Sequence, residues 1–217
     1  MHKTIVNLEV IKEKLKQLNH AKEKTKIIAV SKTFPSNDIL PLIQHGHQHF
    51  GENKIQEALE KWPTIKKNFP NINLHMLGKV QSNKVKFLLP IFDYLHSLDN
   101  IKLAEKIAIE EKKNNKKLKI FIQVNIANES QKNGIDINEL DEFYSICIKK
   151  FSLNVIGLMC LPPFSLDSKK YFLGLNAAAK KINLHELSMG MSNDYNTAVE
   201  CGSTFVRIGS NIFGSRN

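Results

Sequence analysis

The chain has little cysteine and no paired cysteine motif. Its three cysteines, Cys147, Cys160 and Cys201, are an odd number, and none of them belongs to a C-x-x-C pair. A disulfide framework and a cysteine-based zinc site are therefore not expected. We interpret all three as reduced thiols of the hydrophobic core.

Long apolar runs are also missing. No segment approaches the length of about 20 apolar residues that a membrane helix needs. Residues 1–6 lack the continuous apolar core of a signal peptide. We therefore expect a cytoplasmic protein that does not associate with membranes.

Arginine is scarce, although the chain is basic. The formal net charge is +10, and only Arg207 and Arg216 of the 31 basic residues are arginine. The lysines are spread along predicted helices, without the interleaved aromatic residues or the arginine-rich tract that nucleic-acid-binding segments use. Nucleic acid is therefore not expected as a partner, and a basic binding module stays open only as an alternative.

The chain does contain a regular alternation of strand and helix patterns. Apolar residues at helical spacing predict an amphipathic helix over residues 4–19. Eight short strands are then predicted at 27–30, 48–50, 73–77, 93–97, 119–125, 155–158, 185–188 and 204–207. This pattern favours the α/β class, as a TIM (β/α)8 barrel that forms a single domain over residues 1–217 with an extra N-terminal helix.

An open, doubly wound sheet is the alternative fold. Such a sheet usually binds phosphate through a glycine-rich loop after its first strand, and no G-x-G-x-x-G follows Val30. Polar residues just after strand ends predict helix starts at 36–38, 82–83, 99–100 and 193–194, and 110–115 is interpreted as a solvated helix end. Short loops of this kind leave the functional side chains at the C-terminal rim of a barrel.

Lys32 is the first candidate functional residue. The apolar run at 27–30 ends on Ser31, Lys32 and Thr33, so the amine is expected at a strand end, partly shielded from water. Partial loss of hydration favours the neutral amine that a Schiff base with a carbonyl compound requires. A lysine that simply points into solvent is the alternative.

Small and hydroxyl-bearing residues gather in the last two strand–loop units, residues 187–214. They are Ser188, Gly190, Ser192, Asn193, Gly209 and Ser210. The loops after strands seven and eight often hold phosphate in barrels, so we interpret this segment as a phosphate site, with tight turns and a helix cap as the alternative. Arg207 lies within the eighth strand, where a buried guanidinium is expected to face a ligand or a carboxylate.

Two further segments place polar side chains just past short strands. Asn53 and His75 could approach a ring, although a core position is the commoner fate of a histidine such as His75. The alternating His45, His47 and His49 come without an evident set of acidic or cysteine ligands, so a metal site is rejected there.

Seven motifs occur in order from about residue 29 to the end of the chain. They are AVSKT, FGENKIQE, LGKVQSNK, HSLD, IQVNIANESQKNG, GLMCLPP and the block LSMGMSND…VECGSTFVRIGSNIFG. Together they resemble the pyridoxal 5′-phosphate (PLP) homeostasis proteins. The resemblance implies a barrel similar to the N-terminal domain of alanine racemase, with PLP as cofactor.

Roles for individual residues follow from the resemblance alone. It implies that Lys32 holds PLP as a Schiff base, and that Arg207 faces the pyridine nitrogen or leans toward the phosphate. The implied cofactor-binding residues are Lys32, Asn53, Ser188, Ser192, Arg207, Gly209 and Ser210, of which Ser192, Gly209 and Ser210 would surround the phosphate and Ser188 is an additional candidate.

Racemisation needs proton-transferring groups on both faces of the bound substrate, and in alanine racemase one of them is a tyrosine from the partner subunit. No tyrosine follows Lys32 in the corresponding loop, where Phe34 and Pro35 stand. We also expect no counterpart of the second domain of alanine racemases after the IFG motif. The expected function is therefore a PLP carrier in intracellular PLP (vitamin B6) homeostasis and amino-acid balance, without strong catalysis. It would hand PLP to apo-enzymes, as a monomer or weak dimer. A PLP-dependent racemase-like enzyme is the alternative.

Overall fold

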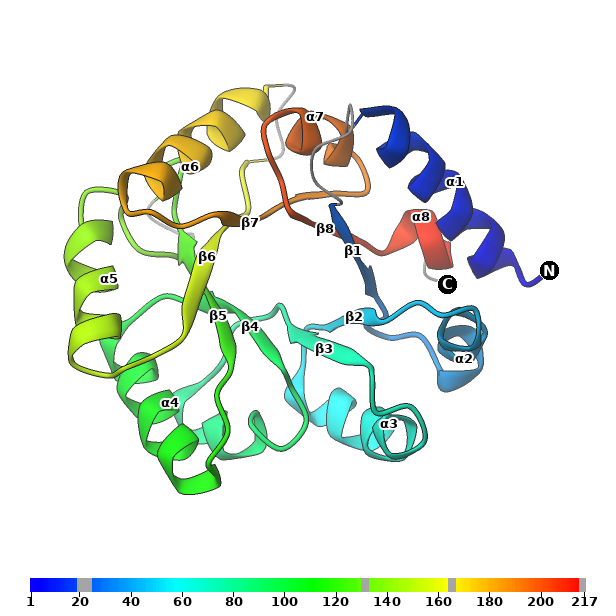
Figure 1. Ribbon diagram of the computed structural model, residues 1–217, viewed down its shortest axis with the longest axis horizontal. Helices are drawn as coiled ribbons and strands as arrows, with labels where there is room; N and C mark the ends of the chain where they lie inside the picture. The colour runs from blue at the N-terminus through cyan, green and yellow to red at the C-terminus, as the bar shows by residue number, and fades with distance from the viewer. Residues whose placement is uncertain (19–24, 130–132, 164–166, 215–217) are drawn as a thin grey trace.

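Eight parallel strands form a closed barrel in the computed structural model, which describes residues 1–18, 25–129, 133–163 and 167–214 (Figure 1). Each strand pairs with the next one in the sequence, and β8 closes the ring on β1, from Lys26 opposite Phe205 to Ala29 opposite Ile208. The strands are β1 (Lys26–Val30), β2 (His49–Glu52), β3 (Asn73–Met76), β4 (Tyr94–Leu98), β5 (Lys119–Val124), β6 (Val155–Cys160), β7 (Glu186–Met191) and β8 (Phe205–Ile208). The predicted TIM barrel and all eight predicted strands are confirmed.

Helices surround the barrel (Figure 1). Those that connect successive strands are α2 (Ser36–Gln44), α3 (Ile55–Asn68), the 3-10 helix η1 (Ser82–Phe87), α4 (Ile101–Asn114), α5 (Leu140–Lys149), α6 (Lys169–Lys181) and α7 (Tyr195–Glu200), and α8 (Ser210–Phe213) follows the last strand. The predicted N-terminal helix is present as α1 (Lys3–Leu18), which packs against α8 and α7. Residue 19 of that prediction, and residues 130–132 of the IQVNIANESQKNG motif, lie outside the described residues.

Strand β1 is apolar on both faces because it is covered on both sides. Ile27 and Ala29 belong to the core between the barrel and its helices, whereas Ile28 and Val30 belong to the core inside the barrel. This double burial explains why β1 appears in the sequence as a continuous apolar run instead of an alternating pattern. Cys147, Cys160 and Cys201 are free and buried, as predicted.

The predicted helix starts are confirmed, because helices begin at Ser36, Ser82, Ile101 and Tyr195. Two local predictions need correction. Of the polar residues expected to cap these four helices, only Asn100 does so, by accepting a hydrogen bond from the Leu103 amide. The segment at 110–115 is not uniformly solvated, because the Glu111 side chain is completely buried. Its carboxylate accepts a hydrogen bond from the Leu118 amide and pairs with Lys117, so it ties the end of α4 to the start of β5.

Within the described residues, no helix combines the length and the apolar character that crossing a membrane requires.

Candidate functional site

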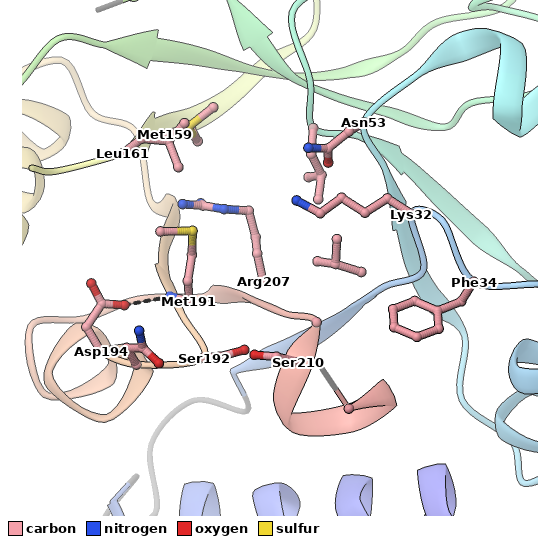
Figure 2. Close-up of a pocket in the computed structure, with 15 residues that line it drawn as sticks. Lys32, Phe34, Asn53, Met159, Leu161, Met191, Ser192, Asp194, Arg207 and Ser210 are labelled. Carbon is pink, nitrogen blue, oxygen red and sulfur yellow. Dashed lines mark hydrogen bonds between the residues drawn. The ribbon is translucent and has the colours of Figure 1, made fainter. Parts of the chain in front are cut away.

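A cavity of about 540 Å³ opens at the C-terminal ends of the barrel strands (Figure 2). Its size falls in the range of small-molecule and cofactor sites, on the order of 300–1,000 Å³. Six of the seven predicted site residues line it: Lys32, Asn53, Ser192, Arg207, Gly209 and Ser210. Residues from β1, β2, β7 and β8, far apart in the sequence, are thus brought to one place by the closure of the barrel.

Lys32 reaches into this cavity from the loop after β1, and Figure 2 shows its side chain extending toward Arg207. The loop is a tight turn, in which the amide of Phe34 donates a hydrogen bond of 3.1 Å to the carbonyl of Ser31. Phe34 itself lines the cavity and stacks on Phe213 of α8, with 4.9 Å between ring centroids. The lysine is therefore presented from a hydrogen-bonded, partly buried turn at the end of β1, as the strand-end pattern predicted.

Asn53 follows β2 and depends on a neighbouring glycine for its position. A Cβ atom on Gly78 would lie 2.1 Å from the carbonyl oxygen of Asn53. The loops after β2 and β3 can therefore approach each other this closely only because residue 78 has no side chain.

The other end of the cavity carries hydroxyl groups. Ser192 follows β7, and Gly209 and Ser210 follow β8. The hydroxyls of Ser192 and Ser210 are turned toward each other in Figure 2. Asp194 also lines the cavity, and its carboxylate is held by a hydrogen bond of 2.7 Å from the Met191 amide.

Arg207 lies in the middle of the site and is 5% exposed. One terminal nitrogen donates to the carbonyl and to the hydroxyl of Ser188, at 2.6 and 2.7 Å, and the other donates to the carbonyl of Cys160 at 2.9 Å. Among the described residues, no carboxylate forms an ion pair with it, although the charge of Asp194 opposes the lowering of its pKa. The expectation that it faces a ligand or a carboxylate stays a prediction. Burial lowers the pKa of the guanidinium, but its ordinary value is so high that the group stays charged.

Ser188 does not line the cavity, which corrects its predicted place around the phosphate. It is completely buried inside the barrel, where its hydroxyl bonds with Arg207 and with Nδ1 of His96, the latter at 2.8 Å. Ser188 therefore holds Arg207 through hydrogen bonds, in a layer of the barrel interior that does not line the cavity.

The hydrogen-bonded chain continues from Ser188 through three histidines. Nε2 of His96 lies 2.9 Å from Nδ1 of His75, and Nε2 of His75 lies 2.9 Å from Nδ1 of His49. Burial lowers the pKa of His75 and His96 well below the ordinary value, and lowers that of His49 to about 4. The three rings are therefore neutral at neutral pH, and the prediction that His75 is a core histidine is confirmed.

The donors and acceptors of this chain allow one arrangement that satisfies every member. Because arginine can only donate, the Ser188 hydroxyl accepts from Arg207 and gives its own proton to Nδ1 of His96. His96 then carries its proton on Nε2 and donates to His75, which donates in the same way to His49. All three histidines are thus assigned as Nε2–H tautomers that carry no charge toward Arg207.

Apolar side chains form the walls of the cavity, and no sequence pattern singles them out. They are Val30, Leu77, Met159, Leu161 and Met191. In the sequence they resemble any other strand-end or core residue, so only the closed barrel shows that they face a common space. Such walls suit a flat aromatic ring.

The groups around this cavity fit PLP. The compound has an aldehyde, for which Lys32 supplies an amine, and an anionic phosphate, for which the Ser192–Ser210 end supplies hydroxyls. The buried guanidinium of Arg207 lacks an anionic partner in the described chain and offers its remaining N–H groups to a polar ligand atom. In the described part of the chain, no three His, Cys, Asp or Glu residues are grouped so that they could hold a metal ion.

Comparisons with known proteins agree with these features. The family model of the alanine racemase N-terminal domain matches residues 6–217. The chain is 35% identical to the pyridoxal phosphate homeostasis protein of Haemophilus influenzae, with 97% of this chain and 95% of that protein covered. It is 34% identical to the protein of the same name from Aquifex aeolicus, with 96% and 95% covered.

Solved structures give the same result. PipY of Synechococcus elongatus with PLP bound is 32% identical and superposes with a TM-score of 0.83, over 94% of this chain and 100% of that chain. An alanine racemase from Bartonella henselae, 20% identical, superposes with a TM-score of 0.73 over 99% of this chain and 60% of the racemase. At that identity the likeness to the racemase concerns the fold.

Proposed function

Because the chain belongs to the alanine racemase N-terminal domain family and, within it, to the pyridoxal phosphate homeostasis proteins, we propose that it binds PLP covalently through Lys32 and acts in intracellular PLP homeostasis. The observation that carries this proposal is the meeting of three groups in one cavity: an amine, a buried guanidinium that has no carboxylate partner among the described residues, and a hydroxyl-lined end.

When bound, PLP supplies an aldehyde carbon with which an amine condenses, releasing one water molecule. Lys32 provides that amine at the rim of the barrel. Ser192, Gly209 and Ser210 would bind the phosphate, and Arg207 would donate to the pyridine nitrogen or to the phosphate. Asn53 lies at the wall beside Lys32 and limits the positions open to the ring.

Arg207 acts as a fixed cation in this site. Ser188 and the carbonyl of Cys160 hold its guanidinium in one orientation, so it needs little reorganisation when a ligand arrives. The histidines behind Ser188 are neutral and add no negative charge beside it, so the guanidinium favours a ligand that brings electron-rich or anionic atoms.

Carriage of PLP suits the site better than racemisation does. A racemase needs proton-transferring groups on two faces of the substrate, whereas the described cavity is lined by no tyrosine and no histidine. Phe34, which has no acidic proton, stands in the loop after Lys32. We propose that the chain hands PLP to apo forms of PLP-dependent enzymes and thereby supports amino-acid balance, with a racemase-like activity as the weaker alternative.

A transfer experiment tests this function. PLP-loaded protein is mixed with the apo form of a PLP-dependent enzyme, and recovery of that enzyme's activity is followed over time. We expect recovery from the loaded protein, while the protein alone leaves L- and D-amino acids unchanged. Rapid interconversion of an amino acid's enantiomers by the purified protein would contradict the carrier and favour the racemase.

A further inference from the structure

The turn that carries Lys32 has an unfavourable backbone conformation. Lys32 and Thr33 are the two central residues between Ser31 and Phe34, whose backbones are joined by a hydrogen bond. Thr33 has φ of 69°, in the left-handed region that glycine and asparagine adopt readily and β-branched residues avoid. Such a conformation persists only where the surrounding structure holds it.

Lys61 of α3 binds both ends of this turn. Its side chain is 13% exposed, and its ammonium group donates to the carbonyl of Ser31 at 3.0 Å and to the carbonyl of Phe34 at 3.3 Å. The same nitrogen lies 2.7 Å from Glu52 and 3.0 Å from Glu57. One cation is therefore shared by both ends of the turn and by two carboxylates.

The two carboxylates hold the residues on either side of Lys32. Glu52, whose side chain is completely buried, accepts hydrogen bonds from the Ser31 hydroxyl at 2.9 Å and from the indole of Trp62 at 3.0 Å. Glu57 accepts the hydrogen bond of the Thr33 amide. Burial raises the pKa of Glu52 against the opposing effect of Lys61, so the cation beside it is what favours its charged form.

We propose that Lys61, Glu52 and Glu57 form a positioning device for Lys32, called here the Lys61 clamp, which holds the strained turn so that the Lys32 amine is aimed into the cavity. The inference rests on the proposed function, because it assigns these residues to the condensation that Lys32 carries out. The clamp lies outside the cavity and does not contact the ligand.

The orientation of the Lys32 amine determines how fast this condensation occurs. The lone pair of the Lys32 nitrogen attacks the aldehyde carbon, a C–N bond forms, and the aldehyde oxygen leaves as one water molecule with two protons from the amine. A nucleophile held in the reactive geometry reacts faster than one that samples many positions, and a misplacement of about 1 Å costs on the order of 100-fold in rate.

The test compares Lys61→Met with Lys67→Met, a matched change at an exposed lysine of the same helix. Two ligands separate positioning from binding: PLP, and pyridoxine 5′-phosphate, which has the same ring and phosphate but an alcohol that cannot condense with an amine. Absorbance after rapid mixing gives the rate constant of Schiff-base formation at saturating PLP. A titration gives the affinity for pyridoxine 5′-phosphate.

We expect Lys61→Met to lower the rate constant by about tenfold or more, while its affinity for pyridoxine 5′-phosphate changes by less than about twofold, since direct ligand contacts carry that affinity. Lys67→Met should match the parent, and Lys61→Arg, which restores a cation between the two carboxylates, should recover part of the rate. An unchanged rate constant in Lys61→Met would overturn the inference. Equal losses for both ligands would also overturn it, because they would mark a general structural role.

A second pair covers the case in which Lys61→Met does not fold. Glu57→Ala removes the acceptor of the Thr33 amide, and Glu60→Ala is the matched change at an exposed residue of the same helix. Glu57→Ala should slow Schiff-base formation, and Glu60→Ala should not. Equal rate constants in these two variants would overturn the inference. Failure of the parent protein itself to form a Schiff base with PLP would refute the proposed function, and the clamp with it, and is distinguished from these outcomes by the parent measurement.

Discussion

Arg207→Gln should separate ligand binding from stability more sharply than any other change in the site. The substitution removes a buried charge that has no carboxylate partner in the described chain. Burying an ion costs several kcal/mol, and that cost is relieved in the variant. Against this stand three hydrogen bonds to Ser188 and Cys160, of about 1.5–3 kcal/mol each because the donor is charged.

The amide of glutamine can restore up to two of those hydrogen bonds. Gains and losses then largely cancel, and the free energy of unfolding without ligand should change by less than about 2 kcal/mol. A bound ligand, by contrast, loses a charge-assisted hydrogen bond of about 1.5–3 kcal/mol, which corresponds to roughly a 10- to 150-fold rise in the dissociation constant for PLP.

Denaturant unfolding of the ligand-free protein and a PLP titration measure the two quantities separately. The Schiff base on Lys32 should still form in the variant at high PLP concentration. A large loss of stability, above about 4 kcal/mol, together with an unchanged affinity for PLP would refute the reasoning and make Arg207 a structural residue of the barrel.

The remaining predictions concern the barrel interior and the site walls. Burial lowers the pKa of His47 to about 3 and that of His49 to about 4, so below the unfolded value near 6.5 the unfolded chain binds more protons than the folded one. The free energy of unfolding should therefore fall as pH drops from about 6.5 to about 4, by up to about 1.4 kcal/mol per pH unit for each such histidine. Denaturant unfolding at a series of pH values measures this dependence. His49→Gln should reduce the change in the free energy of unfolding per pH unit. A free energy of unfolding that does not change between about pH 6.5 and about pH 4 would contradict the prediction. Gly78→Ala places a Cβ atom 2.1 Å from the Asn53 carbonyl. It should cost about 1–3 kcal/mol of stability and weaken PLP binding. Gly174→Ala, within α6, places a Cβ that meets nothing closer than 3.5 Å; it should leave PLP binding unchanged and raise stability by up to about 1 kcal/mol, because alanine is the better helix residue. Equal PLP affinities in these two variants would show that Asn53 is not positioned by Gly78.

Much of the fold could be predicted because a TIM barrel has a strong local signature. Each strand is a short apolar run, and the loops after the strands carry the polar residues, so Lys32 and the Ser192–Ser210 end were found from sequence position alone. Arg207 was found because a charged residue inside an apolar strand is expensive unless it is used.

The layer of the barrel interior that each strand residue occupies could not be predicted from the sequence. Ser188 and Ser192 stand in the same small-residue segment, yet only Ser192 lines the cavity. Which layer of the barrel a strand residue occupies depends on strand tilt and on the register between neighbours, and β7 and β8 show a register shift between Ser188 and Met191. That register shift cannot be predicted from a sequence pattern.

Contacts between residues far apart in the sequence could not be predicted either. His49, His75 and His96 come from three successive strands, β2 to β4, and the closing of the barrel turns them into one chain. Their recurrence once per strand–helix unit was a signal that could have found them. Lys61 appeared in the sequence as one of many helix lysines near an acidic residue, and only the tertiary structure shows that it grips the turn of Lys32.

The most direct test of the central claim is an absorbance spectrum of the purified protein with and without added PLP, followed by borohydride reduction and peptide mapping. We expect a new band at the edge of the visible range and a reduced phosphopyridoxyl adduct on Lys32, both lost in Lys32→Ala. A protein that shows no such band with excess PLP, or that carries the adduct on another lysine while Lys32→Ala still forms it, would show that Lys32 does not hold PLP.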